Sequence, residues 1–426
     1  MNRTLFLFFL LCFSSSLWAQ EDKTSNFSMS AEVRPRYELR DGYKAPLTEE
    51  QDLGQFISNR VRLNMNYNKG PLAASLRFQD VGTWGDRTVF GSGDTHKIGF
   101  FEAWASYRFA PKFALKVGRQ VISYDDERIM GEINWSQQGL SHDALVMQFN
   151  NAAGDVRVDI GASYNQESEK NANSAYPYTN KAMQYLWINQ SDDSFYWSFL
   201  FLNNGTQQAA SEDLKVYYSK TYGVYLNNVK KSNWDVGGSL YAQGGKDVFG
   251  NKIAAFYVAA HLKKALSSSF KLGIGAEVLS GTDMDATDTK NHSFDPIYGT
   301  NHKFNGFMDY FYVGNHKNNV GLQDYYTQLD YKKNKFSASL VGHVFSSMGN
   351  VVNESGDKLD NYLGVELDLT ANYQVDTNFK ISGGYSRMFA SESMQAIKGA
   401  AAGMRSGGNW LFISLDFTPQ FFSISK

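Results

Sequence analysis

The chain has 426 residues, a formal net charge of −2 at pH 7 and a single cysteine. A charge balance this close to neutral argues against a nucleic-acid partner, for which an excess of basic residues is expected. Aromatic residues make up 15% of the chain, which has 37 glycines but only 7 prolines. This composition suits strands with aromatic girdles and tight turns.

The first 19 residues have the pattern of a secretory signal peptide. The apolar run Leu5–Phe13 is followed by small and polar residues and by a cleavage site after Ala19. Cys12 lies inside this run, so we expect the mature chain to lack disulfides, cysteine nucleophiles and cysteine metal ligands. Residues 20–26 are expected to be a short periplasmic segment, too short for a plug domain, and 27–426 a single barrel domain.

From Ser28 to Arg40, polar and apolar residues alternate without a break. Successive side chains of a strand point to opposite faces, so this segment has one charged face and one apolar face. Soluble strands usually run only ~5–6 residues. A longer alternation is typical of a strand that crosses a membrane, with its apolar face on lipid and its charged face on a water-filled lumen.

Similar segments recur along the whole chain, and we predict eighteen strands. They are Ser28–Arg40, Ile57–Tyr67, Leu72–Asp80, Phe100–Phe109, Phe113–Gln120, His142–Phe149, Val156–Asn165, Ala182–Asn189, Phe195–Asn203, Lys220–Leu226, Trp234–Gln243, Ile253–Leu262, Phe270–Leu279, Gln323–Tyr331, Phe336–Phe345, Tyr362–Tyr373, Phe379–Met388 and Trp410–Phe421. The first and last strands must pair, because an open edge in lipid would leave backbone groups unsatisfied. Pro419 lies near the end of the last strand, where a missing donor costs least.

Short and long connections take turns between these strands. Asn68–Pro71 and Lys332–Lys335 are brief, whereas Val121–Ser141 and Gly281–Leu322 are long. Outer-membrane barrels show this asymmetry, with short periplasmic turns and long extracellular loops. The sequence therefore predicts an all-β, transmembrane, antiparallel β-barrel of about 18 strands, or 16, in the outer membrane of a Gram-negative bacterium. The alternative is a secreted soluble all-β protein with several sandwich domains, but no linker divides the chain.

Four arginines are expected to gather on the lumen face of the first two strands. If Arg40 lies opposite Phe56, the facing pairs are Arg36 with Arg60 and Arg34 with Arg62. Like charges placed opposite each other are destabilising, so this cluster needs anions nearby. One interpretation is an anion-gripping strip, since arginine offers a planar bidentate fork. The other is a salt-bridge ladder in the wall, with Glu32, Glu38, Glu102 and Asp159 as the partners.

A sequence motif begins at the end of the fifth predicted strand and continues through the following loop into the sixth. It consists of Gly118, Arg119, Gln120, Arg128, Trp135, Asp143 and Ala144. These residues resemble the alginate-export family of outer-membrane β-barrel porins. Arg34, Arg36, Glu38, Arg60, Arg62, Glu102 and Ala103 extend the resemblance over most of the mature chain, and Gly299, His302, Gly306 and Asp309 match the broader family.

The resemblance implies an eighteen-stranded barrel with an arginine-rich constriction that passes an anionic polysaccharide or other solutes. Arg119 and Arg128 would then be lumen or loop residues near the constriction. Leu140 stands where many relatives have Arg, which argues against alginate in particular. The residues expected to line the pore or bind substrate are Arg34, Arg36, Glu38, Arg60, Arg62, Arg77, Glu102, Arg119, Arg128 and Arg157.

The chain contains residue types that are used in catalysis and metal binding, but their spacing does not form a catalytic triad or an EF-hand. Ser141, His142 and Asp143 are consecutive in a predicted strand and point alternately to opposite faces, so they cannot form a triad. Asp283, Asp285 and Asp288 lack the spacing of an EF-hand. We therefore expect no enzymatic activity, no cofactor and no metal site.

The sequence thus predicts an outer-membrane channel for anionic solutes, an acidic polysaccharide such as alginate or its oligosaccharides among them. A surface binding or adhesion barrel and a barrel hydrolase are the alternatives. The expected surroundings are outer-membrane lipid and lipopolysaccharide, and the sequence does not separate a monomer from an oligomer. The long loop Gly281–Leu322 is expected to fold inward and narrow the pore. The alternatives are that its aromatic side chains cap the barrel outside or stack on sugar rings.

Overall fold

The structure is a computed structural model that describes residues 24–86, 98–172, 174–176, 178, 180–208, 214–228, 233–311, 320–399 and 404–425. The predicted signal peptide, with its cleavage site after Ala19 and with Cys12, lies outside the described residues. The first strand begins at Ser25, two residues before the predicted start of the barrel at Phe27.

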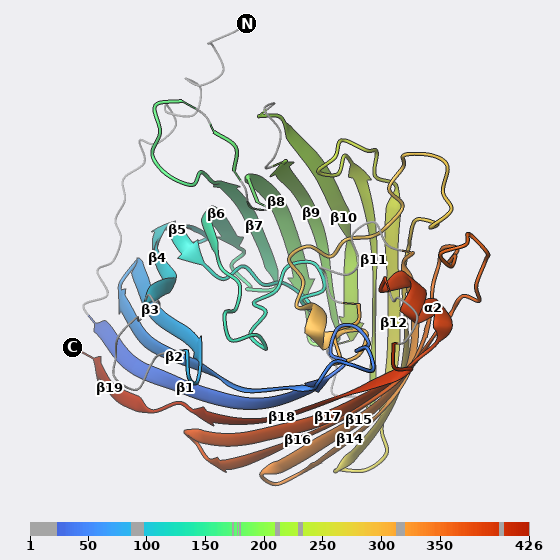
Figure 1. Ribbon diagram of the computed structural model, residues 1–426. Coiled ribbons are helices and arrows are strands. Elements are labelled where there is room, and N and C mark those ends of the chain that lie inside the picture. The colour runs from blue at the N-terminus through green and yellow to red at the C-terminus, as the bar shows by residue number, and fades with distance from the viewer. Residues whose placement is uncertain are drawn as a thin grey trace, which may run out of the picture.

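Nearly all of the described chain is β-structure (Figure 1). The strands are β1 (Ser25–Asp41), β2 (Gly54–Lys69), β3 (Leu72–Thr83), β4 (Gly99–Ala110), β5 (Phe113–Gln120), β6 (His142–Asn150), β7 (Val156–Tyr164), β8 (Ala182–Ser191), β9 (Phe195–Gln207), β10 (Val216–Asn228), β11 (Trp234–Gly245), β12 (Ala255–Ala265), β13 (Phe270–Leu279), β14 (Leu322–Lys333), β15 (Phe336–Ser346), β16 (Tyr362–Asp376), β17 (Phe379–Ala390), β18 (Gly407–Phe417) and β19 (Gln420–Ser425). The helical segments in the described ranges are the 3-10 helix η1 (Asn301–Lys303) and α2 (Glu392–Ile397). None of the helices in these ranges is long and apolar enough to span a membrane.

Strands β1 to β18 each pair antiparallel with their neighbours in sequence, and the sheet closes where β18 and β19 both pair with β1. The last two strands, β18 and β19, lie end to end along β1, so nineteen described strand segments form a wall of eighteen strands. The predicted closed all-β barrel is therefore confirmed, with 18 strands rather than 16. The predicted last strand, Trp410–Phe421, is in fact interrupted at Thr418 and Pro419, because proline has no N–H to give to the ladder.

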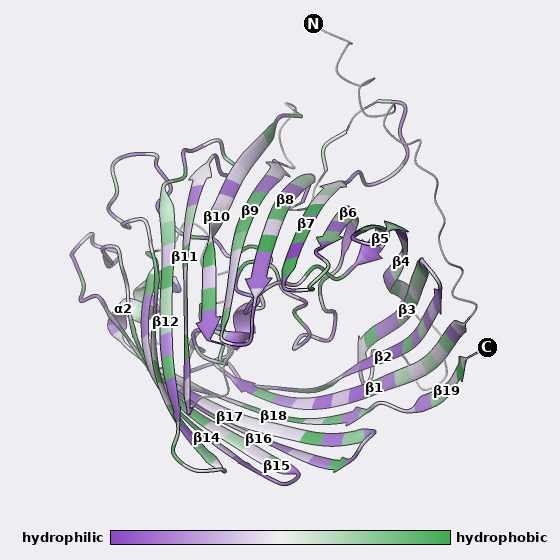
Figure 2. Cartoon of the chain, turned by 180° about the vertical axis from the view of Figure 1, so that it is seen from behind, coloured by the Kyte–Doolittle hydropathy of each residue, from purple (hydrophilic) through white to green (hydrophobic). Residues whose placement is uncertain are grey.

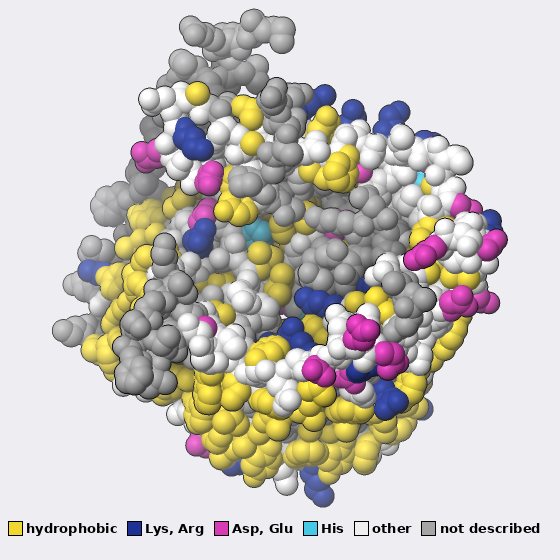
Figure 3. Space-filling model, viewed as in Figure 1, with side chains coloured by type: hydrophobic (Ala, Val, Ile, Leu, Met, Phe, Trp, Pro, Cys, Tyr) yellow, Lys and Arg dark blue, Asp and Glu magenta, His cyan; other side chains and the backbone are white. Residues whose placement is uncertain are grey.

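The two faces of the wall differ as the alternation predicts. Each strand alternates hydrophilic and hydrophobic residues along its length (Figure 2). Leu240, Ile274 and Ile413 on the outer face are 53%, 55% and 50% exposed, as expected for side chains that meet lipid. Hydrophobic side chains cover the visible outside of the wall, whereas lysine and arginine side chains lie in its hollow (Figure 3).

The register of the first two strands differs from the prediction by two residues. Arg40 pairs with Gly54, not with Phe56, and β2 begins at Gly54. As a result Arg34 lies opposite Arg60, and Glu32 lies opposite Arg62. A shift of two keeps every side chain on its own face, so the four arginines of these two strands still point into the lumen. It also places a carboxylate beside Arg62, which lessens the repulsion expected among the arginines.

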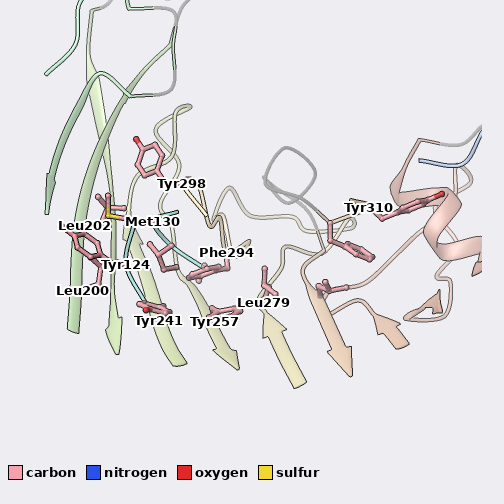
Figure 4. Packing of buried hydrophobic residues seen from close by; sticks show 14 of the residues in the cluster. Tyr124, Met130, Leu200, Leu202, Tyr241, Tyr257, Leu279, Phe294, Tyr298 and Tyr310 are labelled. Atoms are coloured by element: carbon pink, nitrogen blue, oxygen red, sulfur yellow. The ribbon is translucent and has the colours of Figure 1, made fainter. Parts of the chain in front are cut away.

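Two long loops fold into the barrel and fill one half of the lumen with an apolar core (Figures 1 and 4). Tyr124 and Met130 come from the loop 121–141, and Phe294 and Tyr298 come from the segment 280–311. They pack against buried side chains of the inner wall, which are Leu200, Leu202, Tyr241, Tyr257 and Leu279. Burying a large apolar side chain contributes about 1.5–3 kcal/mol, so this core holds both loops inside. The described part of Gly281–Leu322 therefore folds inward, as predicted.

The outward and inward faces of β16 give a matched test of this arrangement. Leu369, in the middle of the strand, is 48% exposed on the outer face, and its neighbour Thr370 points inward and lines two cavities. We expect Leu369→Arg to lower the free energy of unfolding by about 2–4 kcal/mol, because it places a charge in lipid. Thr370→Arg should cost much less. Urea unfolding in lipid vesicles measures both, and equal losses would contradict the assigned faces.

Candidate functional site

Arg34, Arg36, Arg60 and Arg62 form a cationic strip on the lumen face of β1 and β2, called here the arginine strip. Glu32 lies among three of them. It accepts a short hydrogen bond from Arg60 and lies 3.9 Å from the Arg62 guanidinium and 4.0 Å from Arg34. Arg60 and Arg62 are almost fully buried. One carboxylate therefore offsets part of the charge of three guanidinium groups.

A second carboxylate, Glu38, holds the loop-proximal end of the strip. It is 1% exposed and accepts hydrogen bonds from Arg36 at 2.9 Å, from Arg40 at 2.8 Å and from the Trp410 indole at 3.1 Å. Breaking a buried pair by removing one partner usually costs 3–5 kcal/mol, since the other charge is left uncompensated. The salt-bridge interpretation of the strip is thus realised for Glu32 and Glu38.

Guanidinium donors of Arg34 and Arg36 bind the main chain of the loop 121–141. Arg34 donates to the carbonyls of Asn134 and Ser136, each at 2.9 Å, and Arg36 donates to the carbonyl of Trp135 at 2.7 Å. The Arg34 Nε also donates to the Gln137 side chain at 3.0 Å. The strip thereby fixes this loop against the wall about a hundred residues away in sequence. Nothing in the local pattern of the strand identifies these partners.

A stack of planar groups extends from the strip across the lumen. The Arg36 guanidinium lies 4.2 Å from the Trp135 ring centre, and Trp135 stacks on His302 at 4.3 Å with an angle of 12°. Phe307 stacks on His302 at 5.2 Å, and its backbone N–H donates to Asp368 of β16 at 3.3 Å. We call Arg36, Trp135, His302 and Phe307 the crossing stack. It joins the wall at β1 to the wall at β16 through both inward loops.

Hydrogen bonds fix the orientation of His302 within the stack. Its Nδ1 lies 2.7 Å from an oxygen of Asp309, whose second oxygen accepts a short hydrogen bond from the Tyr43 hydroxyl. Burial alone would raise the pKa of the Asp309 carboxyl, but its interactions with His302 and Tyr43 hold that pKa below its usual value. Asp309 therefore stays ionised at neutral pH and acts as the fixed acceptor of this triad.

Buried carboxylates of the wall hold the other inward loop. Glu366 accepts a hydrogen bond from the backbone N–H of Met308 at 2.7 Å, and Asp324 accepts one from Asn305 at 3.1 Å. Gly306 has a φ of +83°, and a Cβ there would lie 2.6 Å from the Glu366 carboxylate, so the close approach requires glycine. Arg128 pairs with Glu277 at 3.1 Å.

Three cavities follow the charged half of the lumen. The loop-side cavity, of about 450 Å³, lies against β1–β3 near the long loops. The middle cavity, of about 280 Å³, lies between Arg34 and the inner faces of β16–β18. The turn-side cavity, of about 310 Å³, lies against β13–β16 near the short turns. Successive cavities share lining residues, so they lie one after another from the loop end to the turn end. We call this series of cavities the route.

The crossing stack lies where this route is divided. The loop-side and middle cavities have Arg36, Trp135 and His302 in common. The middle and turn-side cavities have Thr370 and Asn372 in common. A solute that follows the route must therefore pass the stack, which makes it the candidate constriction.

The charge of the lining changes along the route. The middle cavity has the cationic side chains Arg34, Arg36, Lys303 and Lys380 and one carboxylate, Asp416. Lys303 hydrogen-bonds a backbone carbonyl, that of Asp126, and Lys380 pairs with Asp416. The loop-side cavity has equal numbers of cationic and anionic side chains. The positive excess therefore begins just beyond the stack. Lys303 and Lys380 were not among the predicted residues, because their positions in a loop and at a strand end give no signal in the alternation.

The other predicted pore residues lie apart from the crossing stack. Arg77 pairs with Glu102 at 3.1 Å on the inner face of β3 and β4. Arg157 pairs with Asp159 at 2.7 Å, also on the inner face. Arg128 is fully buried between Glu277 and the rings of Tyr257 and Phe304, so it anchors the loop.

Arg119 differs from the expectation. It shares the strand parity of the outward-facing Val117 and pairs with Asp143 at 2.6 Å, so it lies on the outer face. Gly118 beside it has a φ of +118°, and a Cβ there would lie 2.2 Å from the Ala103 carbonyl. Within the motif, Arg119 therefore does not reach the lumen, and Gly118 allows the close approach of β4 and β5.

Catalytic and metal-binding arrangements do not form around the residues considered above. His142 is buried on the inner face, whereas Asp143 is exposed on the outer face. Within the described ranges, no group of three or more His, Cys, Asp or Glu side chains is placed to hold a metal ion.

The Asp309 triad predicts a simple pH dependence. Because its folded-state pKa is lowered, the triad is intact above the usual aspartate value of about 4 and is lost as the pH falls through the lowered value. We expect the conductance of the barrel to change as the pH falls below about 4 and Asp309 becomes protonated. Asp309→Asn should show the low-pH conductance already at pH 7. A conductance that does not change at all below about pH 4 would contradict this assignment. Planar-bilayer recordings at stepped pH make the measurement.

A family model described as alginate export matches residues 25–407. A search of curated proteins by sequence gives no match.

Several solved structures from Pseudomonas aeruginosa have the same fold. OpdL superimposes with a TM-score of 0.62 at 11% identity, covering 93% of this chain and 99% of that chain. OccK11 (OpdR) has a TM-score of 0.61 at 12% identity, with 93% and 96% covered. OpdK, in its structure with vanillate, has a TM-score of 0.61 at 10% identity, with 93% and 99% covered. Identities this low establish the fold alone.

Proposed function

The chain belongs to the alginate export family, and we propose that it is an outer-membrane channel that passes anionic solutes through its charged half-lumen. The family and the porin-like barrel support an outer-membrane channel rather than an enzyme. Phospholipid and lipopolysaccharide would surround the outer face. The anionic selectivity is our inference from the lining of the route.

The observation that carries this proposal is the charge excess in the middle cavity. Four cationic side chains and one carboxylate line about 280 Å³ immediately beyond the crossing stack. Charged residues lining a narrow pore focus the field and raise the local concentration of counter-ions. Arg34 contributes most directly, because its hydrogen bonds go to neutral acceptors and its nearest carboxylate is 4.0 Å away.

Two comparisons support a carboxylate as the anion. The family description favours an acidic polysaccharide such as alginate, or its oligosaccharides. The structure of OpdK with vanillate favours a small carboxylate, since that barrel has the same fold. Both cargoes carry carboxylates, which arginine and lysine recognise. Leu140 and the crossing stack favour short oligomers or single anions over a long polymer.

Ion selectivity in planar bilayers tests the proposal. We expect purified protein to conduct and to prefer chloride over potassium. The triple variant Arg34→Gln, Lys303→Gln, Lys380→Gln should lower the permeability ratio at least about fivefold, since one unit charge at 4 Å contributes about 1 kcal/mol in water. Lys112→Gln, in the turn between β4 and β5, is the matched control and should leave the ratio unchanged.

Two outcomes would contradict different parts of the proposal. Protein that is folded but never conducts would exclude a channel and favour a surface binding barrel. Protein that conducts without anion preference, or whose preference survives the triple variant, would leave the channel and remove the role given to the cationic lining.

A further inference from the structure

A side pocket of about 310 Å³ lies in the other half of the barrel, near the long loops. Its walls are the inner faces of β9, β10 and β11 together with residues 246–253 and 291–297. Among the described residues it shares no lining residue with the three cavities of the route. Its volume is at the lower end of the range for small-ligand sites, which suits one small molecule.

Hydrogen bonds hold the walls of the side pocket in place. Gln243 and Asp295 form a reciprocal pair, in which the Gln243 amide donates to the Asp295 carbonyl and accepts from its N–H, both at 2.8 Å. The Asp247 carboxylate accepts from the backbone N–H groups of Phe249 at 3.0 Å and Asn251 at 2.9 Å. A pocket with fixed walls loses little entropy when a ligand binds.

Two small, neutral polar side chains in the lining, Asn204 and Thr221, are available to a ligand. Asn204 is 1% exposed and lines the pocket, and its Nδ2 has no hydrogen-bond partner, while its Oδ1 accepts from the Tyr298 hydroxyl at 2.5 Å. A buried donor without a partner is costly, so it favours a ligand that supplies an acceptor. Thr221 accepts from Gln243 at 2.9 Å and keeps its own hydroxyl proton to donate.

The charge and the apolar surface narrow the ligand class. The charged side chains in the lining are one lysine and two aspartates, Lys246, Asp247 and Asp295, which is the opposite balance to the middle cavity. Ile253 and Ile297 provide apolar contact, and the Phe249 ring lies at the rim, 60% exposed. An anion is disfavoured here, whereas a ligand with one C–H face and several hydroxyl groups fits.

We infer that the side pocket is a binding site for a neutral sugar ring, a hexose or a neutral terminal residue of a glycan. The Asn204 amide and the Thr221 hydroxyl meet the sugar hydroxyl groups, and the Phe249 ring meets its C–H face. The site works beside the anion route and does not depend on transport. The loop end of the barrel therefore binds neutral sugar in one half and admits anions in the other.

Ligand-observed saturation-transfer NMR tests this inference on the full-length barrel in a detergent without sugar groups, such as an amine oxide. The probes are the methyl glycosides of glucose, galactose and mannose, with glucuronate as the anionic comparison. We expect at least one neutral glycoside to bind, and to bind more tightly than glucuronate. Phe249→Ala, on an exposed turn, should weaken binding roughly 2- to 10-fold. Trp84→Ala, at another exposed loop aromatic, is the matched control and should not.

Asn204→Leu removes the unpartnered amide, keeps the branching of the side chain and should weaken binding to a similar extent. It also removes the acceptor of the Tyr298 hydroxyl, so folding is checked by circular dichroism. Saturation transfer to none of the neutral glycosides would overturn the inference. So would tighter binding of glucuronate, or equal losses in Phe249→Ala and Trp84→Ala. Because binding is measured without transport, a failure here leaves the anion channel untouched, and Arg34→Gln should bind the glycoside like the wild type.

Discussion

Charge-assisted hydrogen bonds from arginine side chains to main-chain carbonyls organise the interior of this barrel. Arg34 and Arg36 donate to the carbonyls of residues 134–136, and Arg36 also pairs with Glu38, whereas Glu32 lies 4.0 Å from Arg34. Each such bond contributes about 1.5–3 kcal/mol, and a buried guanidinium without acceptors would be strongly unfavourable. The arginine strip and the loop 121–141 therefore need each other, and the position of Trp135 in the lumen follows from their contact.

The two halves of the lumen differ because their inner walls differ. The inner faces of β8–β13 carry large apolar side chains such as Leu202 and Tyr257, which would be costly to leave in water, so both inward loops cover them. The inner faces of β1–β3 and β14–β18 carry most of the charged and polar side chains of the lumen, and the three cavities lie there, although Trp410 and Phe412 of β18 belong to the apolar core. The crossing stack joins the two regions. Apolar burial therefore fills one half of the barrel, and ion pairing keeps the other half mainly polar.

Much of the wall could be predicted from the sequence, because strand parity is a local property. The alternation from Ser28 to Arg40 predicted the correct lumen face, and counting the alternating segments predicted the correct number of strands. The register was wrong by two residues, since parity is unchanged by such a shift. Arg119 was expected in or near the lumen from the family resemblance, although its parity with Val117 indicates the outer face. The carbonyl partners of the strip could not be predicted, unlike Glu32 and Glu38, because carbonyls a hundred residues away leave no pattern in a strand.

The arginine strip holds the loop 121–141 against β1 and β2 inside the lumen, and this contact can be tested directly. The only cysteine of the chain is Cys12, in the predicted signal peptide, so an engineered pair can report on this contact alone. Ser58 and Gln137 face each other with 3.0 Å between the Ser58 hydroxyl and the Gln137 amide nitrogen. Glutamine is longer than cysteine, so in Ser58→Cys, Gln137→Cys a short bifunctional thiol reagent, such as a bis-methanethiosulfonate, takes the place of the missing amide. We expect this reagent to join the two cysteines in outer membranes and to leave the conductance unchanged. A pair that does not cross-link, or a cross-link that alters the conductance, would contradict a loop already anchored at this site.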